Sequence, residues 1–284
     1  MLLAALLTAS GLSAPPDPAQ VIGGDPAPAG QYDAVVRVDR VHVGNHCSGT
    51  LVRPDLVLTA AHCVDDIADT TGLRIWFTSG ISAEVADFGF HPDYCESCDT
   101  NRFDYAYVRL SDPVDAPAAV TVVTDQEVWD STMQTSDVLT VVGFGDVPDR
   151  PVAAEPRWLV EVPIRRFTGG GIEVVAGGDG RDSCEGDSGG AAFVTAPDGT
   201  LQLVAITSRG SDPCGAGGYY GVAYHTMGWL SEVLDDATLC GESCSTCDCL
   251  DTRPLPEDGC CSTDRPQDAP WLLLVLVPLA RRRR

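Results

Sequence analysis

The chain has 284 residues, of which 44% are hydrophobic, so it can bury a substantial core and extensive disorder is excluded. It carries 41 acidic and 18 basic side chains, which give a formal net charge of −23. This charge argues against nucleic acid as a partner, because phosphates need faces rich in lysine and arginine. The acidity favours solubility outside the cell, and attraction of basic substrates is the functional alternative.

The first 20 residues are typical of a secretion signal followed by a short leader. Leucine and alanine fill residues 2–7, small residues follow, and the natural cleavage point lies after Ala14. The twelve cysteines of the chain favour an oxidising compartment over the reducing cytosol. Together these features predict a secreted protein.

Short apolar runs separated by glycine, proline and aspartate dominate residues 21–236, and this pattern is typical of β-strands. Clear examples are residues 34–39, 139–143 and 201–206. The segment ends in a helix candidate over residues 225–234, where Met227, Leu230 and Leu234 recur on one helical face. The pattern therefore predicts an all-β domain that closes with a helix.

Three motifs in this segment each offer one member of a nucleophilic triad. His62 lies in Thr-Ala-Ala-His-Cys, Asp104 enters an apolar run, and Ser188 stands between glycines in Gly-Asp-Ser-Gly-Gly. Histidine, aspartate and serine occur in this chain order in one class of nucleophilic triad. The motifs resemble those of the chymotrypsin/trypsin-like serine proteases, and the resemblance covers about residues 21–236. It implies two packed antiparallel six-stranded β-barrels with a C-terminal α-helix.

The resemblance also implies a role for each side chain. Ser188 is the nucleophile and His62 its base, since a serine hydroxyl alone is weak at neutral pH. Asp104 holds the tautomer of His62 and stabilises the imidazolium. The backbone N–H groups of Gly186 and Ser188 form the oxyanion hole for the tetrahedral intermediate. These roles predict a serine endopeptidase that acts on proteins and peptides through an acyl-enzyme, with no cofactor and no metal.

Val21 and Asp187 match the activation device of the family. There, proteolysis frees an N-terminus at a sequence like the Val-Ile-Gly-Gly of residues 21–24, and the new ammonium is buried against the aspartate. The residue before Val21 is Gln20, not the arginine or lysine typical of zymogens activated by trypsin. This residue argues against self-activation by a trypsin-like cut, and we therefore expect a zymogen with an unknown activating protease.

The base of the primary substrate pocket corresponds, by the resemblance, to Asp182, six positions before the serine. A carboxylate there favours arginine or lysine at the cleaved position through charge-assisted hydrogen bonds. Alignment to the family places small residues along the pocket, namely Ser208, Gly210 and Gly221. Two arginines qualify the expectation, because Arg181 is able to pair with Asp182 and Arg209 replaces the usual aromatic residue. Cleavage after arginine or lysine is the prediction.

The twelve cysteines divide into two groups. In the first, the resemblance implies the bridges Cys47–Cys63 and Cys184–Cys214. Cys95 and Cys98 favour a local loop staple over a redox pair. The second group has six cysteines between Cys240 and Cys261, where a disulfide knot is favoured over zinc ligation because the compartment is oxidising.

The chain is thus expected to comprise a leader (1–20), a protease domain (21–236), a cysteine-rich tail (237–268) and a terminal block (269–284). The apolar stretch in that block is too short for a transmembrane helix and is followed by four arginines. With the Cys-Cys pair before it, the block resembles a tripartite bacterial sorting signal of the myxobacterial type. It predicts that sorting machinery at the membrane directs the protein to the outer cell surface, and a weak tail anchor is the alternative.

One alternative belongs to another functional class, a catalytically silent homologue that binds peptides or proteins at the cell surface. The complete set of catalytic residues argues against it. Gln20, Arg209 and the unusual tail leave it open.

Overall fold

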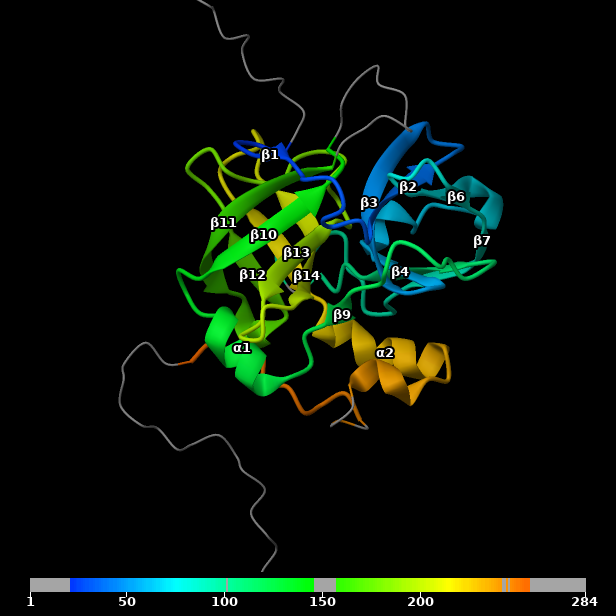
Figure 1. Cartoon of the computed structure of the whole chain (residues 1–284). Coiled ribbons are helices and arrows are strands. Elements are labelled where there is room, and N and C mark those ends of the chain that lie inside the picture. The colour runs from blue at the N-terminus through cyan, green and yellow to red at the C-terminus, as the bar shows by residue number, and fades with distance from the viewer. Residues whose placement is uncertain (1–20, 101, 146–156, 242–243, 245, 256–284) are drawn as a thin grey trace, which may run out of the picture. The chain divides into compact units, whose positions relative to one another are not determined.

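The computed structural model describes residues 21–100, 102–145, 157–241, 244 and 246–255. Two β-sheets dominate these residues, and the two α-helices lie together at one end of them (Figure 1). The predicted leader and the terminal block lie outside the described residues. Within the described part, no helix is both long and apolar enough to cross a membrane.

The first sheet contains seven antiparallel strands from the first half of the chain. In spatial order they are β6 (Ser82–Ala83), β5 (Leu73–Trp76), β2 (Val35–Arg40), β3 (Asn45–Arg53), β4 (Leu56–Thr59), β8 (Ala106–Leu110) and β7 (Val85–Phe90). Alternation directs the apolar side chains inward, and in β5 Leu73 and Ile75 are buried whereas Arg74 and Trp76 are partly exposed. The inward residues form a hydrophobic core of their own.

The second sheet contains eight strands. Their order is β1 (Asp25–Pro26), β11 (Trp158–Phe167), β10 (Val138–Gly143), β13 (Ala191–Thr195), β14 (Leu201–Gly210), β15 (Gly218–Val222) and β12 (Glu173–Ala176), with β9 (Thr121–Val122) beside β14. Because β11 also pairs with β12, the sheet closes on itself. The predicted all-β fold with two barrel-like sheets is confirmed, with two differences: the sheets contain seven and eight strands rather than six each, and β9 pairs with β14 in parallel.

Two α-helices accompany the sheets. The helix expected at residues 225–234 is present as α2 (Tyr224–Val233) and buries Met227 and Leu230. A second helix, α1 (Gln126–Thr132), is capped by Asp125, whose carboxylate accepts hydrogen bonds from two backbone N–H groups of the first turn. Short 3₁₀ turns complete the fold: η1 (Ala61–Cys63), η2 (Thr70–Gly72), η4 (Gly169–Gly171) and η5 (Ala237–Cys240).

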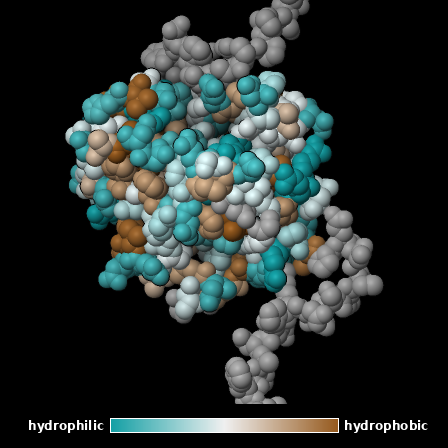
Figure 2. Space-filling view, turned by 180° about the vertical axis from the view of Figure 1, so that it is seen from behind, coloured by the Kyte–Doolittle hydropathy of each residue, from teal (hydrophilic) through white to brown (hydrophobic). Residues whose placement is uncertain are grey.

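The cysteine-rich tail packs onto the preceding residues, and one compact unit extends to Pro254. Leu250 is 7% exposed and belongs to the core of the second barrel. The described tail cysteines form two bridges, Cys240–Cys247 and Cys244–Cys249. The disulfide interpretation is therefore confirmed for these four, and Cys260 and Cys261 lie outside the described residues. Figure 2 shows hydrophobic and hydrophilic residues interspersed over the face opposite the view of Figure 1.

Candidate active site

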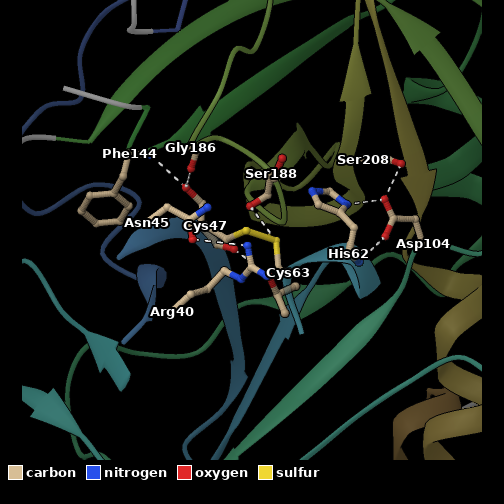
Figure 3. Close-up of a disulfide and its surroundings, with 12 residues drawn as sticks. Arg40, Asn45, Cys47, His62, Cys63, Asp104, Phe144, Gly186, Ser188 and Ser208 are labelled. Carbon is tan, nitrogen blue, oxygen red and sulfur yellow. Dashed lines mark hydrogen bonds and ion pairs between the residues drawn. A yellow bond between two sulfur atoms is a disulfide. The ribbon is translucent and has the colours of Figure 1, made fainter. Parts of the chain in front are cut away.

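The two barrels contribute different members of the predicted triad. His62 lies in η1, directly after β4, and Asp104 lies just before β8, so both belong to the first barrel. Ser188 lies in the turn that leads into β13 of the second barrel. Figure 3 shows the imidazole of His62 between the side chains of Ser188 and Asp104. The fold thus brings together three residues that are far apart in the sequence.

Asp104 holds His62 by two hydrogen bonds. The Nδ1–H group of His62 donates to Asp104 Oδ2 at 2.8 Å, and the backbone N–H of His62 donates to Oδ1 at 3.0 Å. The hydroxyl of Ser208 donates to the same Oδ2 at 2.6 Å. These hydrogen bonds fix the orientation of the ring and keep the proton on Nδ1. Nε2 is then the unprotonated nitrogen, which is the form that a general base requires.

The carboxyl of Asp104 is kept ionised although it is only 4% exposed. Burial acts to raise its pKa, but the hydrogen bonds from His62 and Ser208 and the charge of His62 outweigh burial, so the pKa lies below its usual value. An ionised carboxylate in this position is able to stabilise a protonated imidazole.

Close backbone contact anchors the loop that carries Ser188 to the first barrel. The carbonyl of Ser188 accepts a hydrogen bond from the backbone N–H of Ser48 at 2.8 Å. Gly189 has φ +79°, and a Cβ there would lie 2.3 Å from the carbonyl oxygen of Ser48. Only glycine fits at this position. The motif around Ser188 thus requires its glycine for the approach of the two barrels.

The loop that carries Gly186 is held by a residue that no sequence motif identifies. Gly186 has φ +83°, a conformation that favours glycine. Ser48 Oγ donates to the carbonyl of Gly186 at 2.9 Å and accepts from the backbone N–H of Phe144 at 3.0 Å. Ser48 is fully buried in β3. No local motif marks it, because its role arises only when the barrels meet.

Asp187, the expected partner of the activated N-terminus, is fully buried. Its carboxylate accepts hydrogen bonds from the backbone N–H groups of Cys184 at 2.9 Å and Gly145 at 2.8 Å. Burial is the main cause that raises its pKa to about 7. Val21 is only 2% exposed, and the next residue, Ile22, donates its N–H to the carbonyl of Asp182 at 2.8 Å.

Asp182 is buried, and protein groups contact both of its carboxylate oxygens. Oδ1 accepts from Ser183 N–H at 2.8 Å and from the hydroxyl of Tyr220 at 3.1 Å, whereas Oδ2 accepts from Gly217 N–H at 2.9 Å. Burial raises its pKa more than these hydrogen bonds lower it. Arg181 does not pair with it, since its guanidinium donates to the carbonyl of Glu161.

The glycines near Asp182 correct one expectation. A Cβ at Gly221 would lie 2.6 Å from the ring of Tyr105, so this glycine serves the packing between the barrels. The residue beside the carboxylate is Gly218, where a Cβ would lie 3.0 Å from Asp182 Oδ1. Gly210 faces the same group at 4.0 Å. Gly218 and Gly221 both belong to the glycine-rich strand β15.

A cavity of about 250 Å³ adjoins Ser188. Its lining includes Ser183, Cys184, Ser188, Ser208, Arg209 and Gly210. Asp182 lies behind this lining, in contact with Ser183. The cavity thus lies between Ser188 and the region of Asp182.

Three disulfides surround the site, Cys47–Cys63, Cys95–Cys98 and Cys184–Cys214. The first lies directly beside His62 (Figure 3). In the part of the chain that the structure describes, two clusters have the spacing of metal ligands, and each contains two cysteines that are oxidised to a disulfide. Their sulfurs are not available as thiolates, so neither cluster offers a metal site.

Comparison with known proteins agrees with this geometry. The trypsin family profile matches residues 21–228. The chain belongs to the trypsin family of serine proteases. A trypsin-like protease of Streptomyces glaucescens is 29% identical over 78% of this chain and 83% of its own length. A tryptase of Mus musculus is 28% identical over 81% and 96%, and a trypsin of Sarcophaga bullata is 29% identical over 66% and 77%.

Proposed function

We propose that this trypsin-family protein is a serine endopeptidase that cleaves proteins after arginine or lysine. The observation that carries the proposal is the network in which Ser208 and His62 both donate to Asp104 while His62 lies beside Ser188. Membership of the family supports a protease, and the proposal adds the residues and the specificity.

In the proposed reaction, Ser188 Oγ bonds to the scissile carbonyl carbon while His62 Nε2 takes its proton. The oxyanion accepts hydrogen bonds from the N–H groups of Gly186 and Ser188, and one such donor is typically worth about 10²–10³ in rate. The C–N bond then breaks, and His62 gives its proton to the leaving amine. Water attacks the acyl-enzyme by the same relay, which releases the new carboxyl terminus and restores Ser188.

The proposed preference for basic residues rests on Asp182. Its carboxylate lies behind the cavity next to Ser188, and Gly210 and Gly218 place no side chain beside it. A guanidinium or ammonium at the end of a long side chain would bring the countercharge that a buried carboxylate needs.

Activation and location extend the proposal. Cleavage after Gln20 would free the ammonium of Val21 near the buried Asp187, so the uncut chain would be a zymogen with an activating protease as a partner. The leader and cysteine bridges support an extracellular protein. Display at the outer cell surface through a processed tail is the corresponding proposal for residues 269–284.

The test uses protein with a verified Val21 N-terminus and two peptides that differ only in arginine or phenylalanine at the cleaved position. We expect selective cleavage after arginine, and none in the Ser188→Ala variant. Cleavage after phenylalanine would keep the protease and reject the pocket. A folded protein that neither turns over nor reacts with a fluorophosphonate at Ser188 would favour the silent, peptide-binding homologue.

Asp182→Ser tests the pocket itself. Because it removes the charge-assisted hydrogen bond, kcat/KM for the arginine peptide should fall by about 10²-fold or more. Labelling of Ser188 by a small fluorophosphonate should persist, which separates loss of specificity from loss of folding. An unchanged preference for arginine would reject Asp182 as its determinant.

A further inference from the structure

An ion pair lies beside the catalytic network. Glu173 in β12 has a side chain that is 2% exposed, and Arg209 in β14 has one that is 16% exposed. The guanidinium of Arg209 donates to Oε1 of Glu173 at 2.7 Å and to Oε2 at 3.2 Å. It also lies 4.0 Å above the ring of Tyr219. This two-point pairing over an aromatic face holds the guanidinium in one orientation.

The pair reaches the triad through Ser208. Arg209 Nη1 donates to Ser208 Oγ at 3.3 Å, and the same hydroxyl donates to Asp104 Oδ2 at 2.6 Å. Because a lone pair of Oγ then faces Arg209, its proton is directed to Asp104. Glu173, Arg209, Ser208, Asp104 and His62 thus form one hydrogen-bonded series that crosses from the second barrel to the first.

The same pair contacts the loop before Asp104. Arg209 Nη2 donates to the carbonyl of Asp99 at 2.7 Å, and Glu173 Oε1 accepts from the backbone N–H of Arg102 at 3.2 Å. Cys95 and Cys98 form their bridge within this loop. The ion pair therefore links β12 and β14, the strand that carries Ser208, to the segment that carries Asp104.

We propose that Glu173 and Arg209 are positioning residues for the triad: Arg209 orients Ser208, and Glu173 balances its charge beside the His62–Asp104 pair. The inference rests on the proposed function. Without Glu173, the buried cation would stand two hydrogen bonds from Asp104 and would oppose the imidazolium that forms when His62 takes the proton of Ser188. With Glu173 present, Arg209 orients the hydroxyl of Ser208 without disfavouring the protonated form of His62.

Other charged and titratable groups face the same region. Asp65 acts on His62, and Tyr94 and Tyr105 lie in the field of Asp104. His91 packs against Tyr105, with ring centroids 6.1 Å apart. All of these residues are unchanged in the variants of Glu173 and Arg209, so a difference between variants reports on the ion pair.

The experiment measures the pH dependence of kcat/KM for Glu173→Gln and for the double variant Glu173→Gln/Arg209→Gln. Glu173→Gln leaves an unbalanced cation, so the acid limb of the profile should move to lower pH by about half a unit or more. The double variant removes that cation, and its acid limb should return to the wild-type position. Glu173→Asp, which keeps the charge, should leave the limb near that of the wild type.

Arg166→Gln is the matched control, because Arg166 contacts the same tyrosine as Arg209. Its guanidinium lies 5.6 Å from the ring of Tyr219 and donates a hydrogen bond to the hydroxyl of that residue. It should leave the acid limb unmoved. An unmoved limb in Glu173→Gln, or a limb that stays displaced in the double variant, would overturn the proposal. If Glu173→Gln fails to fold, Arg209→Gln takes its place. It leaves the anion of Glu173 unbalanced, so the acid limb should move to higher pH, and an unmoved limb again overturns the proposal.

A readout independent of turnover separates this inference from the proposed function. The ring nitrogens of His62 can be titrated by ¹⁵N NMR in a Ser188→Ala background, with and without Glu173→Gln. A lower titration midpoint in the Gln variant supports the ion pair even if the wild type cleaves no peptide. Equal midpoints reject the ion pair even if the wild type is an active protease.

Discussion

The hydroxyl of Ser48 connects two backbone segments of the second barrel from a strand of the first. It donates to the carbonyl of Gly186 and accepts from the N–H of Phe144. If Gly186 supplies a donor to the oxyanion, the orientation of its peptide units decides where that N–H points. Ser48 then contributes to the rate without any contact with substrate.

We expect Ser48→Ala to lower kcat by about tenfold, since a buried hydrogen bond is worth about 1–1.5 kcal/mol. KM should change little, because the oxyanion exists only in the transition state. The inhibition constant of a peptide aldehyde, which mimics the tetrahedral adduct, should rise in parallel with the loss in kcat.

Thr50→Val is the matched control for this change. Thr50 lies in the same strand and is fully buried, and its hydroxyl has no hydrogen-bond partner among the described residues. The control should leave kcat and aldehyde binding unchanged. Equal losses in both variants would mean that Ser48 supports packing alone.

At the scale of elements, the tail segment is held by one phenol. The hydroxyl of Tyr224 in α2 accepts from the backbone N–H groups of Cys249 at 3.0 Å and Leu250 at 3.1 Å. Further contacts join Gln126 to Asp251 and His225 to Thr252. These bonds explain why the tail packs on the protease domain as far as Pro254.

Tyr224→Phe should lower the free energy of unfolding by about 1–3 kcal/mol, because it leaves the backbone N–H groups of Cys249 and of the buried Leu250 without their acceptor. Urea denaturation of the two proteins measures the difference. Tyr94→Phe is the comparison, since the buried hydroxyl of Tyr94 has no hydrogen-bond partner among the described residues, and its removal should cost nothing. If the two variants are equally stable, the phenol of Tyr224 does not hold the tail.

How far the sequence predicts these elements depends on the range of the interactions. Apolar alternation identifies strands such as β5, and i, i+3, i+7 spacing identifies α2 to within one residue. The seven-residue helix α1 is too short to show a period, and the parallel β9–β14 pair joins segments 81 positions apart. The packing of the tail depends on similarly distant contacts.

The same limit applies to the site. Motifs identify His62, Asp104 and Ser188 because each has a local sequence context. Ser48 and Glu173 have none, since their partners lie on other strands. The sequence does not distinguish Gly221 from Gly218, because both belong to one glycine-rich strand, and only the contacts with Tyr105 and Asp182 separate them.

For the whole molecule, the region where the barrels meet contains several buried carboxylates. Asp104 is paired with His62, and Glu173 is paired with Arg209. Asp187 instead accepts hydrogen bonds from backbone N–H groups, and its pKa is about 7. Since the chain has a net charge of −23, its stability should depend on pH through such groups.

The uncut chain should therefore lose stability as the pH rises. The pKa of Asp187 is about 7 in the folded protein and 3.8 is its ordinary value, so between these values the folded state binds more protons than the unfolded state. Unfolding free energy then falls as pH increases, by up to about 4 kcal/mol across the interval for this one group. Asp187→Asn does not titrate, so the wild type should lose stability relative to this variant between pH 4 and pH 7.

The measurement is urea denaturation at several pH values, with both proteins in a Ser188→Ala background that prevents self-digestion. The readout is how the difference in unfolding free energy between the two proteins changes with pH. The asparagine amide also replaces one acceptor oxygen of Asp187 by a donor, which shifts the absolute stability by the same amount at every pH. Parallel curves would show that Asp187 is ionised throughout. After cleavage before Val21, the new ammonium should favour the ionised carboxylate of Asp187 and reduce the slope. The cleaved protein should then have a higher unfolding free energy at neutral pH than the uncut chain. This linkage would make cleavage stabilising in the pH range where His62 must be neutral to act as a base.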